Sequence, residues 1–243
     1  MLREYVVVDL EMTGLKPARD KILEIGAVHI KDGKFVGEYQ TLVNPMMVIP
    51  ENITALTGIT QEMSDAGADT KEAVGEFLKF AGDLPLIGHN IIYDYGFLKH
   101  NAVNYDLVLE AEVLDTLKLS RKLLPDLEKK SLEALCSHFQ LVREQEHRAL
   151  DDAKVTAQLF ELLQAKFACS QPELFEPKPI IYKVKKQGPI TPRQKKYLKE
   201  LVDYHKIDLP VSIESMTRSE ASRMTDKILA QYGKAKIPSV HLK

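Results

Sequence analysis

The sequence predicts an α/β domain followed by a small helical module, and three observations lead to that prediction. Residues 5–43 contain three apolar runs of strand-like composition. Residues 69–167 alternate short apolar runs with segments of helical spacing, which is the order expected of a sheet flanked by helices. A stretch with four prolines, residues 168–190, then precedes a segment with two helix-start signals.

The first three strands are expected to be antiparallel. The run "YVVVDL", residues 5–10, has the unbroken apolar character of a buried strand. Residues 21–30 and 35–43 have the composition of the next two strands. The dipeptide Asp32-Gly33 between them predicts a hairpin, because tight hairpin turns need residues that accept positive φ.

Helices and short strands are expected to alternate after a loop over residues 44–60 that contains one short helix. Apolar residues within the 69–82 segment recur at helical spacing, and Gly82 gives that helix a stop signal. The remaining predicted elements are a buried strand at 84–90, a helix at 93–103, a strand leading into a helix at 111–124, a helix at 131–141 and a long helix at 147–167.

The composition is that of an ordinary globular protein, with 44% hydrophobic and 28% charged residues among 243. No apolar run is long enough to predict a transmembrane helix, and the chain begins in a strand pattern rather than a signal peptide. Two cysteines do not make a disulfide framework. We therefore expect a cytoplasmic protein with no membrane partner.

The charge is divided between two parts of the chain. Residues 1–177 hold 18 Lys and Arg against 29 Asp and Glu, a net charge of −11. Residues 178–243 hold 15 against 6, a net charge of +9. An acidic body with a basic tail indicates two modules. The tail is expected either to contact a polyanion or only to improve solubility.

The tail itself predicts two helices. Thr191 and Thr217 each begin a capping-box pattern, and Gly233 is a stop signal for the second helix. We accordingly divide the chain into a domain over 1–167, a proline-rich linker over 168–190 and a small basic helical module over 191–243.

Four carboxylates stand where the predicted elements begin or end. Asp9 and Glu11 are two positions apart on the first strand, so both side chains point to the same face. Asp94 follows a short buried strand, and Asp152 lies early in the long helix. Oxygen-only clusters suit Mg²⁺ or Mn²⁺. Two such ions, about 3.5–4 Å apart, would stabilise the attacking and leaving oxygens of a phosphoryl displacement.

His147 is the candidate general base, because a neutral imidazole can accept a proton from an attacking water near pH 7. It precedes Asp152 by five residues. Taken alone, each of these signals has a more common explanation, since a single D-x-E on a strand is more often a surface ion pair. Their occurrence together, in compatible structural contexts, favours a catalytic site.

Three segments resemble the exonuclease motifs of the DnaQ-like DEDDh exonucleases, relatives of bacterial polymerase III proofreading exonucleases. They are "VVVDLEMTGL", "LIGHNIIYDYGFL" and "HRALDDA", and they occur in the order of that family. The resemblance extends over residues 4–165. It implies a ribonuclease H-like fold, with a five-stranded mixed sheet flanked by helices.

The resemblance also implies a role for each residue of the site. The ligands of two metal ions would be Asp9, Glu11, Asp94 and Asp152, and the general base would be His147. The residues that hold the 3′-terminal nucleotide or support it would be Thr13, Gly14, Leu15, Asn90 and Phe97.

The expected activity is 3′–5′ hydrolysis at ends of single-stranded or frayed nucleic acid, releasing nucleoside 5′-monophosphates, with DNA favoured. Met12 departs from the proofreading pattern, and "DLEMTGL" resembles the first motif of oligoribonucleases. An RNA-trimming enzyme of the oligoribonuclease or RNase T kind is therefore one alternative. A non-catalytic adaptor that binds 3′ ends is another. Expected partners are 3′ ends of DNA or RNA and a DNA polymerase or repair complex.

Overall fold

The computed structural model describes residues 1–143, 147–209 and 212–235. Within it the chain divides into two compact units, Met1–Val184 and Lys185–Lys243. Of the predicted helical module, residues 236–243 lie outside the described part of the chain.

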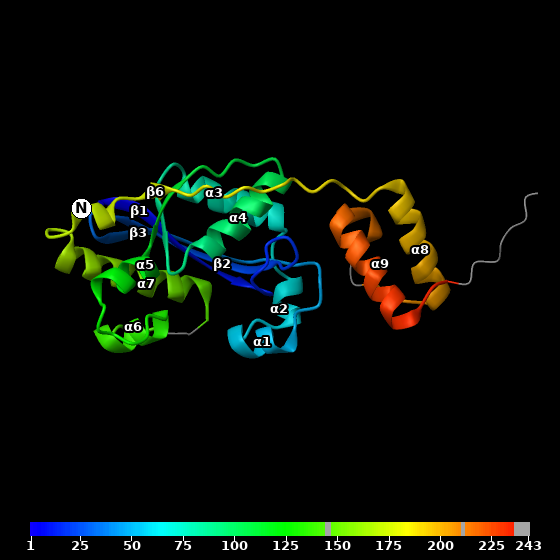
Figure 1. Ribbon diagram of the computed structural model, residues 1–243, viewed down its shortest axis with the longest axis horizontal. Coiled ribbons are helices and arrows are strands. Elements are labelled where there is room, and N and C mark those ends of the chain that lie inside the picture. Colours follow the sequence, from blue (N-terminus) through cyan, green and yellow to red (C-terminus); the bar gives the residue numbers. More distant parts are fainter. Residues whose placement is uncertain (144–146, 210–211, 236–243) are drawn as a thin grey trace, which may run out of the picture. The chain divides into compact units, whose positions relative to one another are not determined.

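A mixed sheet forms the centre of the first unit, with the strand order β3-β2-β1-β4-β5-β6 (Figure 1). The chain opens with the antiparallel strands β1 (Glu4–Met12), β2 (Ile22–Lys31) and β3 (Lys34–Leu42), as predicted. Asp32 and Gly33 both have positive φ, which confirms the tight turn between β2 and β3.

The other half of the sheet is built from short strands. β4 (Leu86–Gly88) is parallel to β1, and β5 (Glu112–Asp115) is parallel to β4. β6 (Lys178–Pro179) pairs antiparallel with β5 and makes a sixth strand where five were expected. It lies within the stretch predicted as a linker, which Phe175 anchors by packing against Phe160 in the core.

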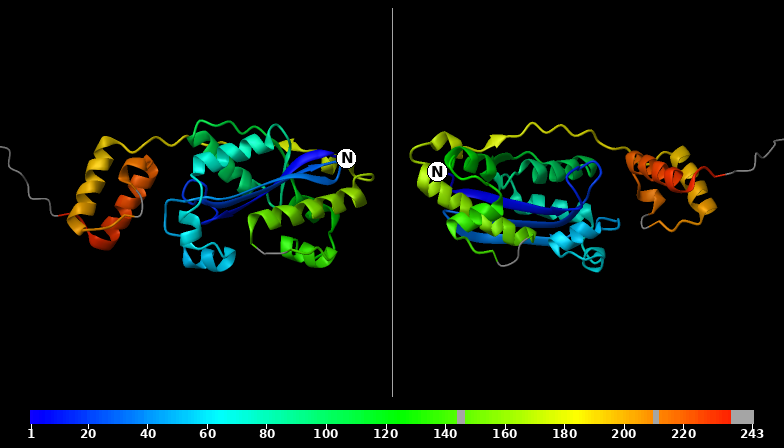
Figure 2. Two further views of the ribbon diagram at one scale, coloured as in Figure 1. Left: turned by 180° about the vertical axis from the view of Figure 1, so that it is seen from behind. Right: turned by 60° about the horizontal axis from the view of Figure 1, so that its bottom comes forward.

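Helices cover both faces of this sheet (Figures 1 and 2). One face packs against α3 (Thr70–Ala81) and α4 (Ile92–Asn104). The opposite face packs against α5 (Thr116–Leu123), α6 (Leu132–Phe139) and α7 (Ala149–Phe167). Because strand side chains alternate, β1 supplies Val6 and Val8 to the first layer and Tyr5 and Val7 to the second.

The loop after β3 contains two short helices, α1 (Glu51–Thr57) and α2 (Gln61–Asp65), where the sequence predicted one. Gly58, with a φ of 70°, ends α1 in the left-handed conformation. The Thr60 side chain then caps the backbone N–H of Met63 and begins α2. The sequence prediction missed this second cap.

The second unit consists of α8 (Pro192–His205) and α9 (Arg218–Tyr232). Both predicted capping boxes form, at Thr191 with Gln194 and at Thr217 with Glu220. The apolar core between the helices contains Leu198, Leu201, Met216, Ala221 and Ile228. Nowhere in the described ranges is a helix both long and apolar enough to span a membrane.

Candidate active site

The predicted metal ligands come from three elements whose ends meet at one edge of the sheet. Asp9 and Glu11 lie near the C-terminal end of β1, Asp94 in the first turn of α4 and Asp152 in the first turn of α7. Since β4 is parallel to β1, the start of α4, just after β4, lies at the same end of the sheet as the end of β1. Three of the four side chains are buried and Asp9 is partly buried.

Asp94 is fixed directly to the first strand. Its Oδ1 accepts a hydrogen bond from the backbone N–H of Leu10 at 3.0 Å. Burial raises the pKa of Asp94 to about 7, and hydrogen bonds from backbone N–H groups oppose that increase. The contact joins the second predicted motif to the first.

The cluster is strongly electronegative. Burial raises the pKa of Asp9 well above its usual range, and the charges of Asp94, Asp152 and Glu11 raise it further. The pKa of Glu11 is raised to about 8. Burial is the largest cause, and the charges of Asp152 and other nearby carboxylates also raise it. Carboxylates in this state favour either a proton or a bound cation.

His147 lies within this cluster. Glu11, His147 and Asp152 each offer one ligand atom, and these atoms lie within 4.8 Å of one another. His147 adopts a left-handed backbone conformation, with a φ of 57°, just before α7 begins. The donor set is rich in carboxylate oxygen with one imidazole nitrogen, and it fits Mg²⁺ or Mn²⁺.

A buried ion pair that the sequence prediction missed fixes the start of α7. The Glu24 side chain on β2 is fully buried, and its oxygens accept hydrogen bonds from Arg148 Nε at 3.1 Å and Nη2 at 2.7 Å. They also accept the backbone N–H of Ala149 at 3.1 Å and the amide of Gln40 at 2.8 Å. The pair thereby ties β2 to the residue that follows His147.

Close backbone packing reinforces this attachment. A Cβ on Gly26 would lie 2.1 Å from backbone atoms of Ala149 and Leu150, so only glycine fits there. The sequence does contain a signal for Glu24, because it is the one carboxylate within the apolar run "LEIGAV".

A second arginine, Arg143, pairs with a predicted metal ligand. Its Nη1 lies 3.0 Å from Oδ1 of Asp152, and the two side chains are only 7% and 8% exposed. The sequence prediction did not single out Arg143, and its separation from Asp152 by nine positions gave no periodic signal. The cluster therefore contains a cation supplied by the chain itself.

The predicted nucleotide contacts in the loop after β1 differ in exposure. Thr13 is buried, and its hydroxyl accepts the backbone N–H of Lys21 at 2.9 Å. Gly14 packs so closely on Asp20 that a Cβ would lie 2.5 Å from its carboxylate oxygen. Leu15 is 61% exposed, so its apolar side chain lies at the surface.

The two supporting residues of the second motif are held from inside the domain. Asn90 has a φ of 67°, and its backbone N–H donates to Asp115 Oδ1 at 3.0 Å. The Asp115 side chain also caps the N-terminus of α5, so it connects α5 to the segment that contains Asn90. Phe97 is fully buried in the core and offers no surface to a nucleotide, so it can support the site only through packing.

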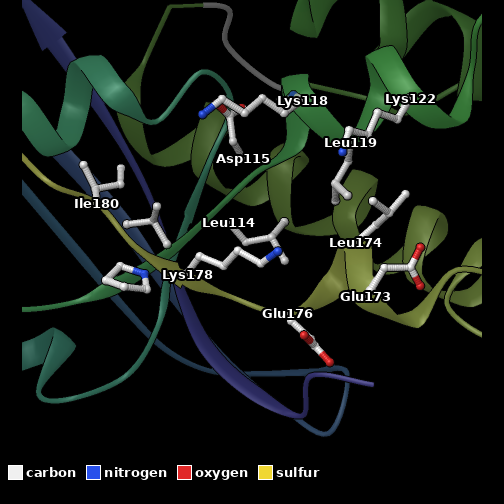
Figure 3. A pocket seen from close by; sticks show the side chains of 12 residues that line it. Leu114, Asp115, Lys118, Leu119, Lys122, Glu173, Leu174, Glu176, Lys178 and Ile180 are labelled. Carbon is white, nitrogen blue, oxygen red and sulfur yellow. Dashed lines mark hydrogen bonds and ion pairs between the residues drawn. The ribbon is translucent and has the colours of Figure 1, made fainter.

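A separate pocket lies beside β5 and β6 (Figure 3). Its polar lining mixes acidic and basic side chains, which are Asp115, Lys118, Lys122, Glu173, Glu176 and Lys178. None of the predicted site residues lines it.

Comparison with known proteins shows which family the chain belongs to. The RNase T family model, described as an exonuclease, matches residues 6–160 of the chain. The chain belongs to this exonuclease family. The match confirms the resemblance to DnaQ-like exonucleases and the expectation of a hydrolytic enzyme, and it includes all three predicted motifs.

Curated relatives include PolC-type DNA polymerases III. The one from Clostridium perfringens is 43% identical over 158 residues, covering 65% of this chain and 11% of that protein. The one from Bacillus subtilis is 38% identical over 160 residues, covering 64% and 11%. The chain thus spans about a tenth of the length of these relatives.

Solved structures of exonucleases have the same fold. Exonuclease X in complex with 5′ overhanging duplex DNA is 26% identical, with a TM-score of 0.57, covering 70% of this chain and 96% of that chain. Escherichia coli exonuclease I in complex with a dT13 oligonucleotide is 17% identical, with a TM-score of 0.62, covering 72% and 43%. These similarities confirm the ribonuclease H-like fold.

Proposed function

We propose that the chain is a divalent-metal-dependent 3′–5′ exonuclease acting on single-stranded or frayed 3′ ends, with DNA as the favoured substrate. One observation carries the proposal: two carboxylates, Glu11 on β1 and Asp152 on α7, lie with His147 in one group, and the charges of both, with that of Asp94, act on Asp9. The products would be nucleoside 5′-monophosphates. The ion would be Mg²⁺ or Mn²⁺, and we propose two ions per site.

The ligands of these ions would be Asp9, Glu11, Asp94 and Asp152. Divalent ions bound there supply charge neutralisation and electrophilic activation of the phosphate. His147 would accept the proton of the attacking water, since its imidazole lies beside the carboxylates of Glu11 and Asp152. The Leu15 side chain would contact the terminal nucleotide through its exposed surface.

DNA is favoured because the relatives above are DNA polymerases and a structural neighbour was solved with DNA. The same relatives suggest a DNA polymerase or repair complex as partner. Met12, in the oligoribonuclease-like "DLEMTGL", supports RNA trimming as the second candidate. The basic module over residues 191–243 would be a separate part of the chain in either case.

The test is a gel assay with 5′-labelled single-stranded DNA and RNA of matched sequence, run with Mg²⁺, Mn²⁺ or EDTA. The matched control is Asp9→Ala, which we expect to retain the fold and lose at least about 10³-fold in rate, because several kcal/mol of transition-state stabilisation depend on the ions. A ladder that shortens from the 3′ end only with metal supports the proposal. The substrate that gives the stronger ladder, DNA or RNA, shows which sugar the enzyme prefers.

Two results would contradict the proposal. Full activity in Asp9→Ala would exclude the carboxylate cluster as the catalytic site. Tight binding of 3′ ends without hydrolysis of either substrate would favour the adaptor.

A further inference from the structure

Arg143 places a positive charge beside Asp152, one of the proposed ligands of the metal ions. Its Nη1 lies 3.0 Å from Oδ1 of Asp152, and both side chains are almost completely buried. A buried charge is retained only where an opposite charge compensates for its lost hydration. The guanidinium is therefore held by the carboxylate cluster rather than by solvent.

The influence of Arg143 extends beyond one carboxylate. Burial and neighbouring acids raise the pKa of Asp9, and the positive charge of Arg143 lowers it. Arg143 thus neutralises part of the same group of residues that we propose as metal ligands. Arg148 also lowers the pKa of one proposed ligand, Glu11, but its own ion pair is with Glu24, which is outside that group.

The Arg143 guanidinium and a divalent ion would repel each other if both contacted the same Asp152 oxygen. Such an ion binds a carboxylate oxygen at about 2.0–2.6 Å. Added to the 3.0 Å between Asp152 and Arg143, this places the two cations no more than about 6 Å apart. Like charges at that separation in a partly buried site repel strongly.

We propose that Arg143 is an internal counter-ion of the catalytic carboxylates, and that its guanidinium must leave Asp152 when a divalent metal ion binds. This inference rests on the proposed metal-dependent function. It implies that the chain itself neutralises part of the site when metal is scarce and that Arg143 weakens metal binding. Removing its charge should therefore strengthen binding, whereas removing a supporting residue would weaken it.

The test is a calorimetric titration of the full chain with Mn²⁺. We expect Arg143→Met, which keeps an unbranched apolar side chain without the charge, to lower the Kd for Mn²⁺ by about tenfold or more. Arg143→Lys keeps the charge and should stay nearer the wild-type value. Should Arg143→Met not fold, Arg143→Gln is the substitute, because it keeps hydrogen-bond donors for Asp152.

A matched control removes the same charge from an exposed ion pair. Lys154 on α7 lies 3.0 Å from Glu38, and both side chains are at least a third exposed. Lys154→Met should change the Kd for Mn²⁺ by less than about twofold, because solvent and salt screen its charge.

A second measurement follows unfolding temperature in EDTA and in Mn²⁺. Arg143→Met should melt below wild type in EDTA, since the carboxylates lose their internal counter-ion, and should gain more than wild type when Mn²⁺ is added. An unchanged or weaker Mn²⁺ affinity in Arg143→Met would overturn this inference while leaving metal binding by the wild type intact. Absence of Mn²⁺ binding in the wild type would overturn the proposed function as well.

Discussion

Glu11 and Glu24 face each other on adjacent strands of one sheet, yet they belong to two regions of opposite character. Glu24 is fully buried and is matched by Arg148, Gln40 and the backbone of Ala149. Glu11 stands with Asp152 and His147, and burial together with neighbouring acids raises its pKa to about 8. One carboxylate is neutralised within the fold and the other lies among further carboxylates.

The difference shows how a fold can hold a charged site without neutralising it completely. The Glu24–Arg148 pair fixes the chain immediately after His147 and at the start of α7, which carries Asp152. The region around Glu24, whose charge is neutralised by Arg148, therefore positions the carboxylate cluster, whose charges are not fully neutralised. A buried carboxylate with its own cation supports the fold, whereas a cluster of carboxylates with raised pKa values favours a proton or a cation.

Among the predictions that compare the two regions, the largest effect concerns His147, which lies in the carboxylate cluster next to Arg148 in the sequence. We predict that His147→Ala lowers kcat by about 10²–10⁴-fold, the range typical of a lost general base. Its effect on Mn²⁺ affinity should be smaller than its effect on kcat. Single-turnover digestion and calorimetry of the same variant would measure the two quantities, and an unchanged kcat would exclude the base role.

The second prediction concerns the buried Glu24–Arg148 pair. Arg148→Met leaves Glu24 buried without its cation, and we expect it to lower the free energy of unfolding by about 3–5 kcal/mol. Urea unfolding followed by circular dichroism would measure this loss. If the variant were as stable as wild type, the Glu24–Arg148 pair would not be the attachment that distinguishes the two regions.

The third prediction uses pH to separate the regions. The pKa of Asp94 is raised to about 7 and that of Glu11 to about 8 in the folded chain, above the usual carboxyl value of about 4. The folded state therefore binds these protons more tightly than the unfolded state, and the resulting stability is complete below about pH 4 and lost as pH rises through 7 and 8.

In EDTA, the unfolding temperature should accordingly fall between pH 5 and pH 9. Each 1 kcal/mol lost would lower it by about 2–4 °C for a chain of this size. Saturating Mg²⁺ should flatten the dependence, because bound metal replaces the protons. A metal-free chain that gained stability over this pH range would contradict the proposed electrostatics of the cluster.

The smallest effect is expected at the surface. Lys154→Met breaks an exposed ion pair with Glu38, in which the charged atoms are 3.0 Å apart, as they are in the buried Arg143–Asp152 pair. We expect a loss of at most about 1 kcal/mol in unfolding free energy, because solvent already screens the exposed charges. A loss equal to that of Arg148→Met would show that burial does not account for the difference.

Much of the first unit could be predicted from local signals. Unbroken apolar runs, the Asp32-Gly33 turn and the stop at Gly82 gave the opening strands and α3. The capping boxes at Thr191 and Thr217 gave the two helices of the second unit. The five candidate residues of the catalytic site could be proposed because three short motifs carry them in a recognisable order.

What the sequence did not reveal depends on contacts between distant residues. Glu24 and Arg148 are 124 positions apart, and no local pattern shows that they meet. Arg143 gives no sign in the sequence of its pairing with Asp152. The sixth strand was missed because its prolines suggested a linker, whereas the apolar residues around them hold it on the sheet.

The central claim is that divalent metal binds to the carboxylates of Asp9, Glu11, Asp94 and Asp152 and not to the neighbouring Glu24. The most direct measurement is the Mn²⁺ affinity of Glu11→Gln and Glu24→Gln beside wild type, obtained by calorimetry at a temperature where all three are folded. We predict that Glu11→Gln loses most of its affinity, whereas Glu24→Gln keeps measurable binding despite its lower stability. Wild-type affinity in Glu11→Gln would contradict the account.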